Sequence, residues 1–266
     1  TAGGTGKTPF CAWAAELLRS EGWRPAILSR GYGRNEGTGL DDENRLLEAL
    51  VPGVPVVVNP DRCEGARTAT DRFGADVAIL DDGFQHRRLA RDVDVMLVDA
   101  LLPLGGGHML PRGMLREPPD QLRRADAIVV TRSDCADTER LAHIESMLDD
   151  LARDVPIACA AHRPTTLRRL RPRGVREQVD LEQVRDGRWG AFCGIGNPSA
   201  FRLTLRQMGA DLGLFRAFPD HYQYDVDVLR STVEQARRAG CSALVTTDKD
   251  AVKVSGFLHA LPRMPV

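Results

Sequence analysis

Five short runs of apolar residues constrain the fold of this chain more than any other feature of its sequence. Near-continuous runs of valine, isoleucine and leucine are typical of strands that are buried on both faces. Segments with helical periodicity separate them, and this alternation favours a parallel α/β sheet with helices on both faces. The runs lie at 24–30, 54–58, 76–81, 93–99 and 127–131.

The same alternation resumes late in the chain, after a break. Residues 163–187 are rich in arginine and punctuated by proline, which predicts a linker. A strand is expected at 187–196, helices at 198–209 and 227–240, and a further strand at 242–247. We therefore expect a larger lobe over 1–162 and a smaller α/β lobe over 188–266.

The first predicted helix, 9–20, shows the clearest amphipathic pattern. Apolar side chains recur at intervals of three and four residues and form one stripe, which we expect to face the core. Gly22 follows as a plausible helix end. The stripe consists of Phe10, Trp13, Ala14, Leu17 and Leu18.

Composition excludes several classes of protein. The net charge is only -1, so a nucleic acid partner is not indicated. The six cysteines are scattered without a C-x-x-C pair, which argues against a zinc site or a disulfide framework and favours a reducing cytosol. No run of about 18 apolar residues is present, so no transmembrane segment is expected.

A glycine-rich stretch at the start of the sequence predicts a nucleotide site. Gly6, Lys7 and Thr8 match the end of the phosphate-loop pattern G-x-x-x-x-G-K-[ST]. Lys7 is expected to reach the β- and γ-phosphates of ATP, and the Thr8 hydroxyl to bind Mg²⁺. The helix behind the loop offers its positive end to the anion. The predicted ATP loop comprises Thr1, Ala2, Gly3, Gly4, Thr5, Gly6, Lys7 and Thr8.

Thr1 stands where the general pattern has its first glycine. A loop of this kind normally follows a buried strand, and no residues precede it here. The expectation is therefore a nucleotide-binding lobe that lacks its first strand.

Two carboxylates follow the apolar run that ends near residue 80. Asp81 and Asp82 stand at the end of this predicted strand, where folds with a phosphate loop hold Mg²⁺. Neighbouring residues of a strand point to opposite faces, so the two carboxylates cannot act alike. One would meet the metal or its water, and the other would cap the turn at Gly83 or orient a neighbour. The sequence leaves open which does which.

Three further polar clusters follow strands or precede helices, at 29–34, 41–44 and 218–225. Sites of α/β proteins are built from such loops. A kinase acting on a sugar hydroxyl needs a base to take the proton, and Asp42 and His221 are of the right chemical type. On composition alone, however, an aspartate placed like Asp42 is more often a helix N-cap, and a histidine placed like His221 is more often a surface loop residue.

Eight motifs along the chain together resemble the tetraacyldisaccharide 4'-kinase family of lipid A synthesis. The resemblance runs from residue 1 to about 254, and the sequence D-D-G-F-Q-H is its most specific part. The motifs, in order, are TAGGTGKTP, ILSRGYGR, DDENRLL, ILDDGFQHRRLARD, LPRGMLREP, FCGIGNP, FPDHYQYD and TTDKDAVK.

This resemblance implies a Mg²⁺-dependent transfer of the γ-phosphate of ATP to the 4'-hydroxyl of a tetraacyldisaccharide 1-phosphate, giving lipid IVA. It also implies a lipid substrate at a membrane surface and a peripheral location on the cytoplasmic side of the inner membrane. Asp42 is implied as the catalytic base, His221 as its support, and Glu43 as part of the Mg²⁺ and ATP shell. The implied substrate-binding residues are Arg30, Tyr32, Arg62, His86 and Arg116.

The sequence departs from the family pattern, and two alternative functions are left open. Asn44 stands where the family usually has proline. A nucleotide-driven ATPase switch, such as a metallochaperone or a partitioning protein, also uses a loop of this kind. An inactive truncated remnant is the other alternative. The apolar, glycine-rich segment 101–110 could contact acyl chains or form a buried loop.

Overall fold

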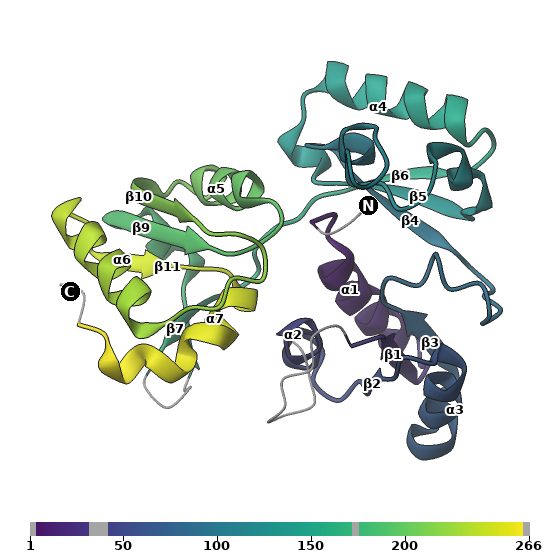
Figure 1. The fold of residues 1–266 in the computed structure, drawn as a ribbon, viewed down its shortest axis with the longest axis horizontal. Helices are drawn as coiled ribbons and strands as arrows, with labels where there is room; N and C mark the ends of the chain where they lie inside the picture. Colours follow the sequence, from purple (N-terminus) through teal and green to yellow (C-terminus); the bar gives the residue numbers. More distant parts are fainter. Residues whose placement is uncertain (1–3, 32–41, 172–175, 263–266) are drawn as a thin grey trace. The chain divides into compact units, whose positions relative to one another are not determined.

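The structure is a computed structural model that describes residues 4–31, 42–171 and 176–262. The chain divides into two compact units, Thr1–His162 and Arg163–Val266 (Figure 1). Among the described residues, the N-terminal unit forms two parallel sheets and the C-terminal unit one, and each unit has its own buried core. The predicted class, a parallel α/β fold with helices, is confirmed.

The first sheet of the N-terminal unit has the strand order β2-β1-β3, and all its strands are parallel. Successive side chains of its central strand point to opposite faces. Ile27 packs with α1 and α2, whereas Ala26 and Leu28 pack with α3, so helices cover both faces. The elements are α1 (Lys7–Ser20), β1 (Pro25–Ser29), α2 (Asp42–Leu50), β2 (Val56–Val58), α3 (Arg62–Phe73) and β3 (Val77–Leu80).

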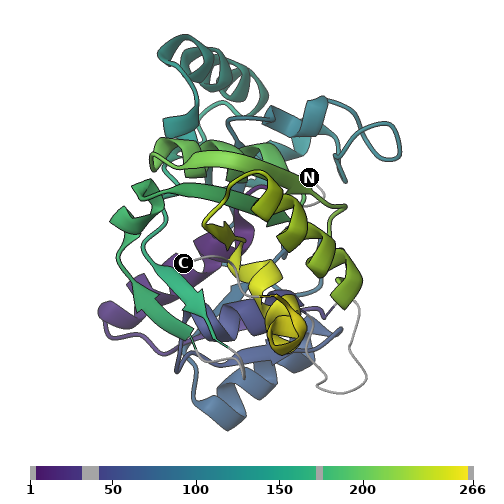
Figure 2. The same cartoon turned by 90° about the vertical axis from the view of Figure 1, so that its left-hand side faces the viewer.

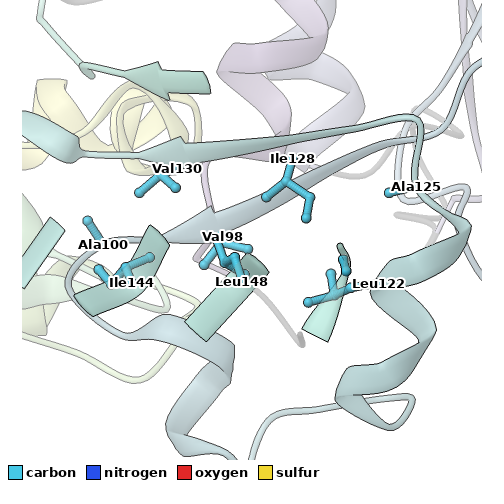
Figure 3. Packing of buried hydrophobic residues seen from close by; sticks show 9 residues of the cluster. Val98, Ala100, Leu122, Ala125, Ile128, Val130, Ile144 and Leu148 are labelled. Carbon is cyan, nitrogen blue, oxygen red and sulfur yellow. The ribbon is translucent and has the colours of Figure 1, made fainter. Parts of the chain in front are cut away.

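The second sheet of this unit has the order β4-β5-β6, again parallel. Ile128 and Val130 of its central strand pack against Ile144 and Leu148 of α4, and Figure 3 shows this cluster. The elements are β4 (Val95–Asp99), η1 (Pro103–Gly106), η2 (Pro119–Arg124), β5 (Ala127–Thr131), η3 (Ser133–Cys135), α4 (Thr138–Leu151) and β6 (Ile157–Ala160).

The C-terminal unit is built on the parallel sheet β10-β9-β11 and on an antiparallel pair, β7 and β8. The pair is seen as two adjacent green strands in Figure 2. Its core contains Phe192, Tyr224, Leu229 and Val254. The elements are β7 (Leu167–Leu170), β8 (Arg176–Val179), η5 (Leu181–Arg185), β9 (Arg188–Cys193), α5 (Pro198–Gln207), β10 (Asp211–Ala217), α6 (Val226–Arg238), β11 (Ala243–Val245), α7 (Asp248–Val254) and η6 (Ser255–Ala260).

The five predicted strands of the N-terminal unit are present as β1 to β5. The predicted strands and helices of the C-terminal unit are present as β9, α5, α6 and β11. The analysis of the sequence missed β6 and β10. Alanines make β6 short and weakly apolar, and Gly213 and Arg216 interrupt the apolar pattern of β10.

The segment predicted as a linker, 163–187, contains β7, β8 and η5. The two strands pair from Leu167 opposite Val179 to Leu170 opposite Arg176. An antiparallel pair can leave one face in water, so few apolar residues suffice to form it. This is why the segment reads as a linker in sequence.

The predicted apolar stripe of α1 is only partly buried. Trp13 is 57% exposed and Leu17 is 45% exposed, while the buried residues of this helix are Cys11, Ala12 and Ala15. Small side chains let α1 lie close to β1 and α2, with which they share a core cluster. Trp13 and Leu17 therefore point outward, while Phe10, Ala14 and Leu18 are half-buried.

Candidate functional site

The described part of the glycine-rich loop turns directly into the N-terminus of α1. Gly4 and Gly6 have φ angles of 75° and 85°, a left-handed conformation that glycine adopts without strain. Helix α1 begins at Lys7, and Gly6 at its cap position supplies no side-chain hydrogen bond to the first turn. The backbone N–H groups of this turn are therefore the kind of positive end that binds anions.

Residues at the ends of two other strands hold this loop. The Thr131 hydroxyl, at the end of β5, donates to the carbonyl oxygen of Thr5 at 3.0 Å. Arg132 donates to the carbonyl oxygen of Gly4 at 2.8 Å and to Asp99, at the end of β4, at 2.6 Å. The loop thus lies at the carboxyl edge of the parallel strands, where α/β proteins place ligands. Sequence reasoning did not single out these anchors, although each follows an apolar run.

Asp82 lies between two cations. Its Oδ1 is 3.7 Å from the Nζ of Lys7, and its Oδ2 accepts a hydrogen bond from the guanidinium of Arg116. Burial raises the pKa of Asp82, but Lys7 and Arg116 outweigh burial and bring this pKa below its ordinary value. The carboxylate therefore stays charged and orients both cations.

The turn after β3 requires its unusual sequence. Asp82 has a φ of 56°, a conformation that aspartate tolerates better than most residues. A Cβ on Gly83 would lie 2.5 Å from the Cβ of Leu80, so only glycine fits there. The N–H of His86 donates to the carbonyl oxygen of Gly83 at 2.9 Å and closes the turn. Burial and the nearby Arg62 lower the pKa of His86.

Asp81 faces a different environment from Asp82. It is only 7% exposed, and its Oδ1 lies 3.7 Å from the Sγ of Cys11 in α1. Burial, followed by the negative charge of Glu43, raises the pKa of Asp81 to about 6, although Lys7 opposes the shift. Arg62, itself 4% exposed, donates to the backbone carbonyl of Asp81 at 3.0 Å. The structure thereby separates the two carboxylates: Asp82 is paired with cations and Asp81 is buried beside an acidic neighbour.

The structure brings together most of the predicted residues of the N-terminal unit that it describes. Direct contacts or electrostatic interactions connect Lys7, Glu43, Arg62, Asp81, Asp82 and Arg116. Thr8 lies half-buried in the first turn of α1, and Arg30 is exposed after β1. Thr1, Ala2, Gly3 and Tyr32 lie outside the described residues. Asp42 begins α2, but its side chain is outside the described part of the structure.

His221 belongs to the C-terminal unit. It has a φ of 58°, and its Nε2 lies 3.4 Å from the Nζ of Lys249. Lys249 also pairs with Asp220 at 3.2 Å. These contacts join the motif at 218–225 to α7 and define a polar cluster on that unit. Lys249 was missed as a neighbour of His221 because the two residues are far apart in sequence.

Asp250 connects two of the C-terminal motifs. It is fully buried, and its Oδ2 accepts hydrogen bonds from the N–H of Gly194 at 2.9 Å and from the Thr247 hydroxyl at 2.8 Å. Its Oδ1 lies 3.5 Å from the Nζ of Lys253, which is also buried. This contact set fixes the loop after β9 against the start of α7.

The donor chemistry of the N-terminal unit suits a hard divalent cation only if the ligand supplies further oxygens. Within the described ranges, no group of three or more His, Cys, Asp or Glu side chains could hold a metal ion. Mg²⁺ usually takes one or two carboxylates and completes its shell with water and substrate phosphates. The buried, acidic surroundings of Asp81 and Glu43 fit that pattern.

No helix among residues 4–31, 42–171 and 176–262 is long and apolar enough to cross a bilayer.

A glycine-rich loop that opens a helix, at the carboxyl edge of parallel strands and beside a strand-end Asp-Asp pair, defines the P-loop class of nucleotide-binding α/β proteins. Residues 1–264 match the family model described as LpxK, tetraacyldisaccharide-1-P 4'-kinase. The chain belongs to this family.

Known relatives agree with this assignment. A tetraacyldisaccharide 4'-kinase of Anaeromyxobacter dehalogenans (strain 2CP-C) is 42% identical over 97% of this chain and 71% of the relative. One from Syntrophus aciditrophicus (strain SB) is also 42% identical, over 96% of this chain and 73% of the relative. A crystal structure of LpxK from Aquifex aeolicus in complex with ATP matches with a TM-score of 0.63. It is 32% identical, over 96% of this chain and 77% of that one.

Proposed function

We propose that this chain transfers the γ-phosphate of ATP to the 4'-hydroxyl of a tetraacyldisaccharide 1-phosphate, giving lipid IVA and ADP in lipid A biosynthesis. The observation that carries the proposal is the family match over residues 1–264, together with the contact of Lys7 and Asp82 beside the phosphate loop. In this reaction the hydroxyl oxygen bonds to the γ-phosphorus, the bond to the β-phosphate oxygen breaks, and a base takes the hydroxyl proton.

Lys7 and the loop amides hold the phosphates. Asp82 keeps the Lys7 ammonium at the start of α1 and holds Arg116 from the other side. Two cations and a helix N-terminus together favour the negative charge that spreads over the transferring phosphoryl group. Arg116 is thus a candidate contact for a phosphate of ATP or of the substrate.

We assign the cation site to Asp81 and Glu43, with the Thr8 hydroxyl. Mg²⁺ bound there would neutralise phosphate charge. Asp81 is the better ligand of the strand-end pair because its carboxylate lies near Glu43, whereas Asp82 is already paired with Lys7 and Arg116. Asp82 then serves to orient those two cations.

Asp42 is the proposed base and His221 its support. The basis for Asp42 is its place in the D-E pair at the start of α2, and its neighbour Glu43 acts electrostatically on Asp81. The basis for His221 is its place in the F-P-D-H motif and its contact with Lys249.

Arg30, Tyr32, Arg62 and His86 are proposed for the substrate side of the site. Arg62 and His86 flank the turn after β3, so their first task is to shape it. Because its substrate is a lipid, the protein is proposed to act at the cytoplasmic surface of the inner membrane, without a nucleic acid partner.

The test is incubation with γ-labelled ATP, Mg²⁺ and the disaccharide 1-phosphate lipid dispersed in detergent, followed by separation of labelled lipid IVA. Lys7→Met should lower turnover about 100-fold or more, since one electrostatic contact to the reacting group is lost. Arg19→Met, at the far end of the same helix, is the matched control and should keep turnover.

A second pair of variants tests the base. Asp42→Asn should abolish most turnover and keep ATP binding, while Glu48→Gln, on an exposed position of α2, should change neither. Dimerisation driven by ATP without labelled lipid would favour the ATPase switch. Absence of ATP binding would favour the inactive remnant.

A further inference from the structure

Residues 101–116, called the docking segment below, follow β4, and apart from Arg116 they have no role in the reaction described above. Three backbone hydrogen bonds close their tip: from the N–H of Leu110 to the carbonyl of Leu115 at 2.9 Å, from that of Gly113 to Met109 at 2.9 Å, and from that of Leu115 to His108 at 3.1 Å. A Cβ on Gly113 would lie 2.2 Å from the carbonyl oxygen of His108. The backbone conformation of the tip is therefore fixed by its own hydrogen bonds.

This loop points apolar side chains into solvent. Leu102, Met109 and Leu110 are 45%, 43% and 54% exposed, whereas Leu115 is only 6% exposed. Pro111 and Arg112 at the tip are exposed as well. Exposed apolar side chains gathered on one segment mark an interaction surface rather than a core.

The charge of the docking segment selects one kind of partner. Residues 100–116 contain Arg112 and Arg116 and no aspartate or glutamate. The next acidic residue, Glu117, is paired with both Arg87 and Arg124. Arg116 is paired with Asp82, so Arg112 is the arginine that the tip offers. Exposed apolar side chains that can enter the acyl boundary, together with this arginine and no acids, are complementary to an anionic lipid surface.

The docking segment is also continuous with the candidate site. Leu102, Leu104 and Leu115 line a pocket that Phe84 and Arg116 also line. Arg116 is the residue that holds Asp82 beside Lys7. The base of the docking segment therefore lies next to the residue that orients Asp82 beside the phosphate loop, whereas Met109 and Leu110 do not line this pocket.

We propose that the docking segment seats the protein on an anionic lipid layer by placing Met109 and Leu110 in its interfacial region, with Arg112 among the headgroups. This inference rests on the proposed function, because it supplies the surface on which a lipid substrate is reached. The occupant is the lipid surface itself. A protein partner is the alternative that the experiment separates.

The experiment measures co-sedimentation of the full chain with vesicles of phosphatidylethanolamine and phosphatidylglycerol, and with vesicles of phosphatidylcholine alone. Met109→Glu with Leu110→Glu should lower the partition coefficient on the anionic vesicles about tenfold or more, because two charges of the wrong sign enter the interface. The control Phe73→Glu with Val93→Glu changes two exposed apolar residues elsewhere in the same unit and should bind like the wild type.

The variant Arg112→Gln tests the electrostatic contribution to vesicle binding. It should weaken binding a few-fold and make it less sensitive to salt, since one screened attraction is lost. Equal binding to anionic and neutral vesicles, equal binding of the Met109/Leu110 variant and the wild type, or no vesicle binding by the wild type would each overturn the proposal. The last two outcomes would leave a protein partner as the occupant of the exposed loop.

A kinase assay separates this inference from the proposed function. On detergent-dispersed substrate, the Met109/Leu110 variant should turn over like the wild type. On substrate embedded in vesicles, it should be slower by about the same factor as its loss of binding. If the wild type yields no labelled lipid on dispersed substrate, the kinase proposal fails, while vesicle binding still decides the docking surface.

Discussion

At the scale of single residues, the neighbouring carboxylates Asp81 and Asp82 have been given opposite surroundings. Asp82 adopts a left-handed backbone conformation and lies between Lys7 and Arg116. Asp81 is buried near Glu43, and its pKa is raised to about 6. One backbone turn therefore separates a carboxylate that positions cations from one that is buried and acted on by a second acidic group.

Replacing Asp82 by asparagine tests this division. The variant keeps the shape of the side chain but leaves Lys7 and Arg116 without their shared counter-charge. Because these ion pairs are partly exposed, the free energy of unfolding should fall by only about 1 kcal/mol or less, while turnover should fall more than about tenfold. Chemical denaturation and the labelled-lipid assay measure the two effects. A loss of stability without a loss of turnover would contradict the assignment.

At the scale of secondary structure elements, turns and the residues that precede strands determine much of the local conformation. The turn after β3 depends on Gly83, since a Cβ there would lie 2.5 Å from Leu80. At the opposite ends of the strands, Asp76 ties the start of β3 to Arg24 just before β1: it accepts from the backbone N–H of Arg24 at 2.7 Å and from its side chain at 3.1 Å.

Gly83→Ala should lower the free energy of unfolding by about 1–3 kcal/mol, because the added methyl group must displace Leu80 or the turn. The turn would shift Asp82 as well, so turnover should also fall. Gly65→Ala is the matched control: its Cβ would meet Asn59 at an ordinary 3.5 Å, and alanine favours the helix by up to about 1 kcal/mol. Urea unfolding of the two variants should therefore give shifts of opposite sign.

Asp76 should contribute to the acid sensitivity of the fold. The N–H of Arg24 lowers the pKa of this carboxyl, against the opposing effect of burial. A lowered pKa in the folded state means that the stabilisation is present above the unfolded pKa of about 3.9 and is lost as the pH falls through the folded pKa. Asp76→Asn should destabilise the protein at neutral pH, and its difference from the wild type should shrink below about pH 4.

Denaturant titrations at several pH values check this expectation. Asp71→Asn, which changes an exposed carboxylate of α3, is the control for the loss of one acidic residue. A difference between the Asp76 variant and the wild type that stays constant down to acid pH would rule out the linkage.

At the scale of the whole molecule, the two units have separate cores, and their candidate residues are divided between them. The phosphate loop, Asp81 and Asp82 belong to the first unit, while His221, Lys249 and Asp250 belong to the second. The second unit contains the buried pair of Asp250 and Lys253. Removing one partner of such a pair leaves a buried charge uncompensated.

Asp250→Ala should therefore destabilise the second unit by about 3–5 kcal/mol. Asp248→Asn, in an exposed pair at the start of the same helix, should cost about 1 kcal/mol or less. In calorimetry, an ATP analogue should stabilise the unit that carries Lys7. Its free energy of unfolding should rise by about 2.7 kcal/mol when the concentration of the analogue is a hundred times its Kd. Loss of ATP binding in the Asp250 variant would show that the units do not unfold separately.

Much of the fold could be predicted because its signals are local. Apolar runs predicted the strands β1 to β5, and the glycines before Lys7 predicted the helix start. For α1 the predicted stripe was only partly right, because the most buried positions of the helix are the small residues Cys11, Ala12 and Ala15, which pack closely against the core. The strands inside 163–187 were missed because half-exposed antiparallel strands need few apolar residues.

The sequence by itself determined the chemistry: a lysine in a glycine-rich loop, an Asp-Asp strand end, and eight ordered motifs that identify the family. Only the tertiary structure decided which carboxylate meets which charge, since the pKa values of Asp81 and Asp82 depend on burial and on Lys7, Glu43 and Arg116. These groups are distant in sequence, and electrostatic energy depends on their separation in space.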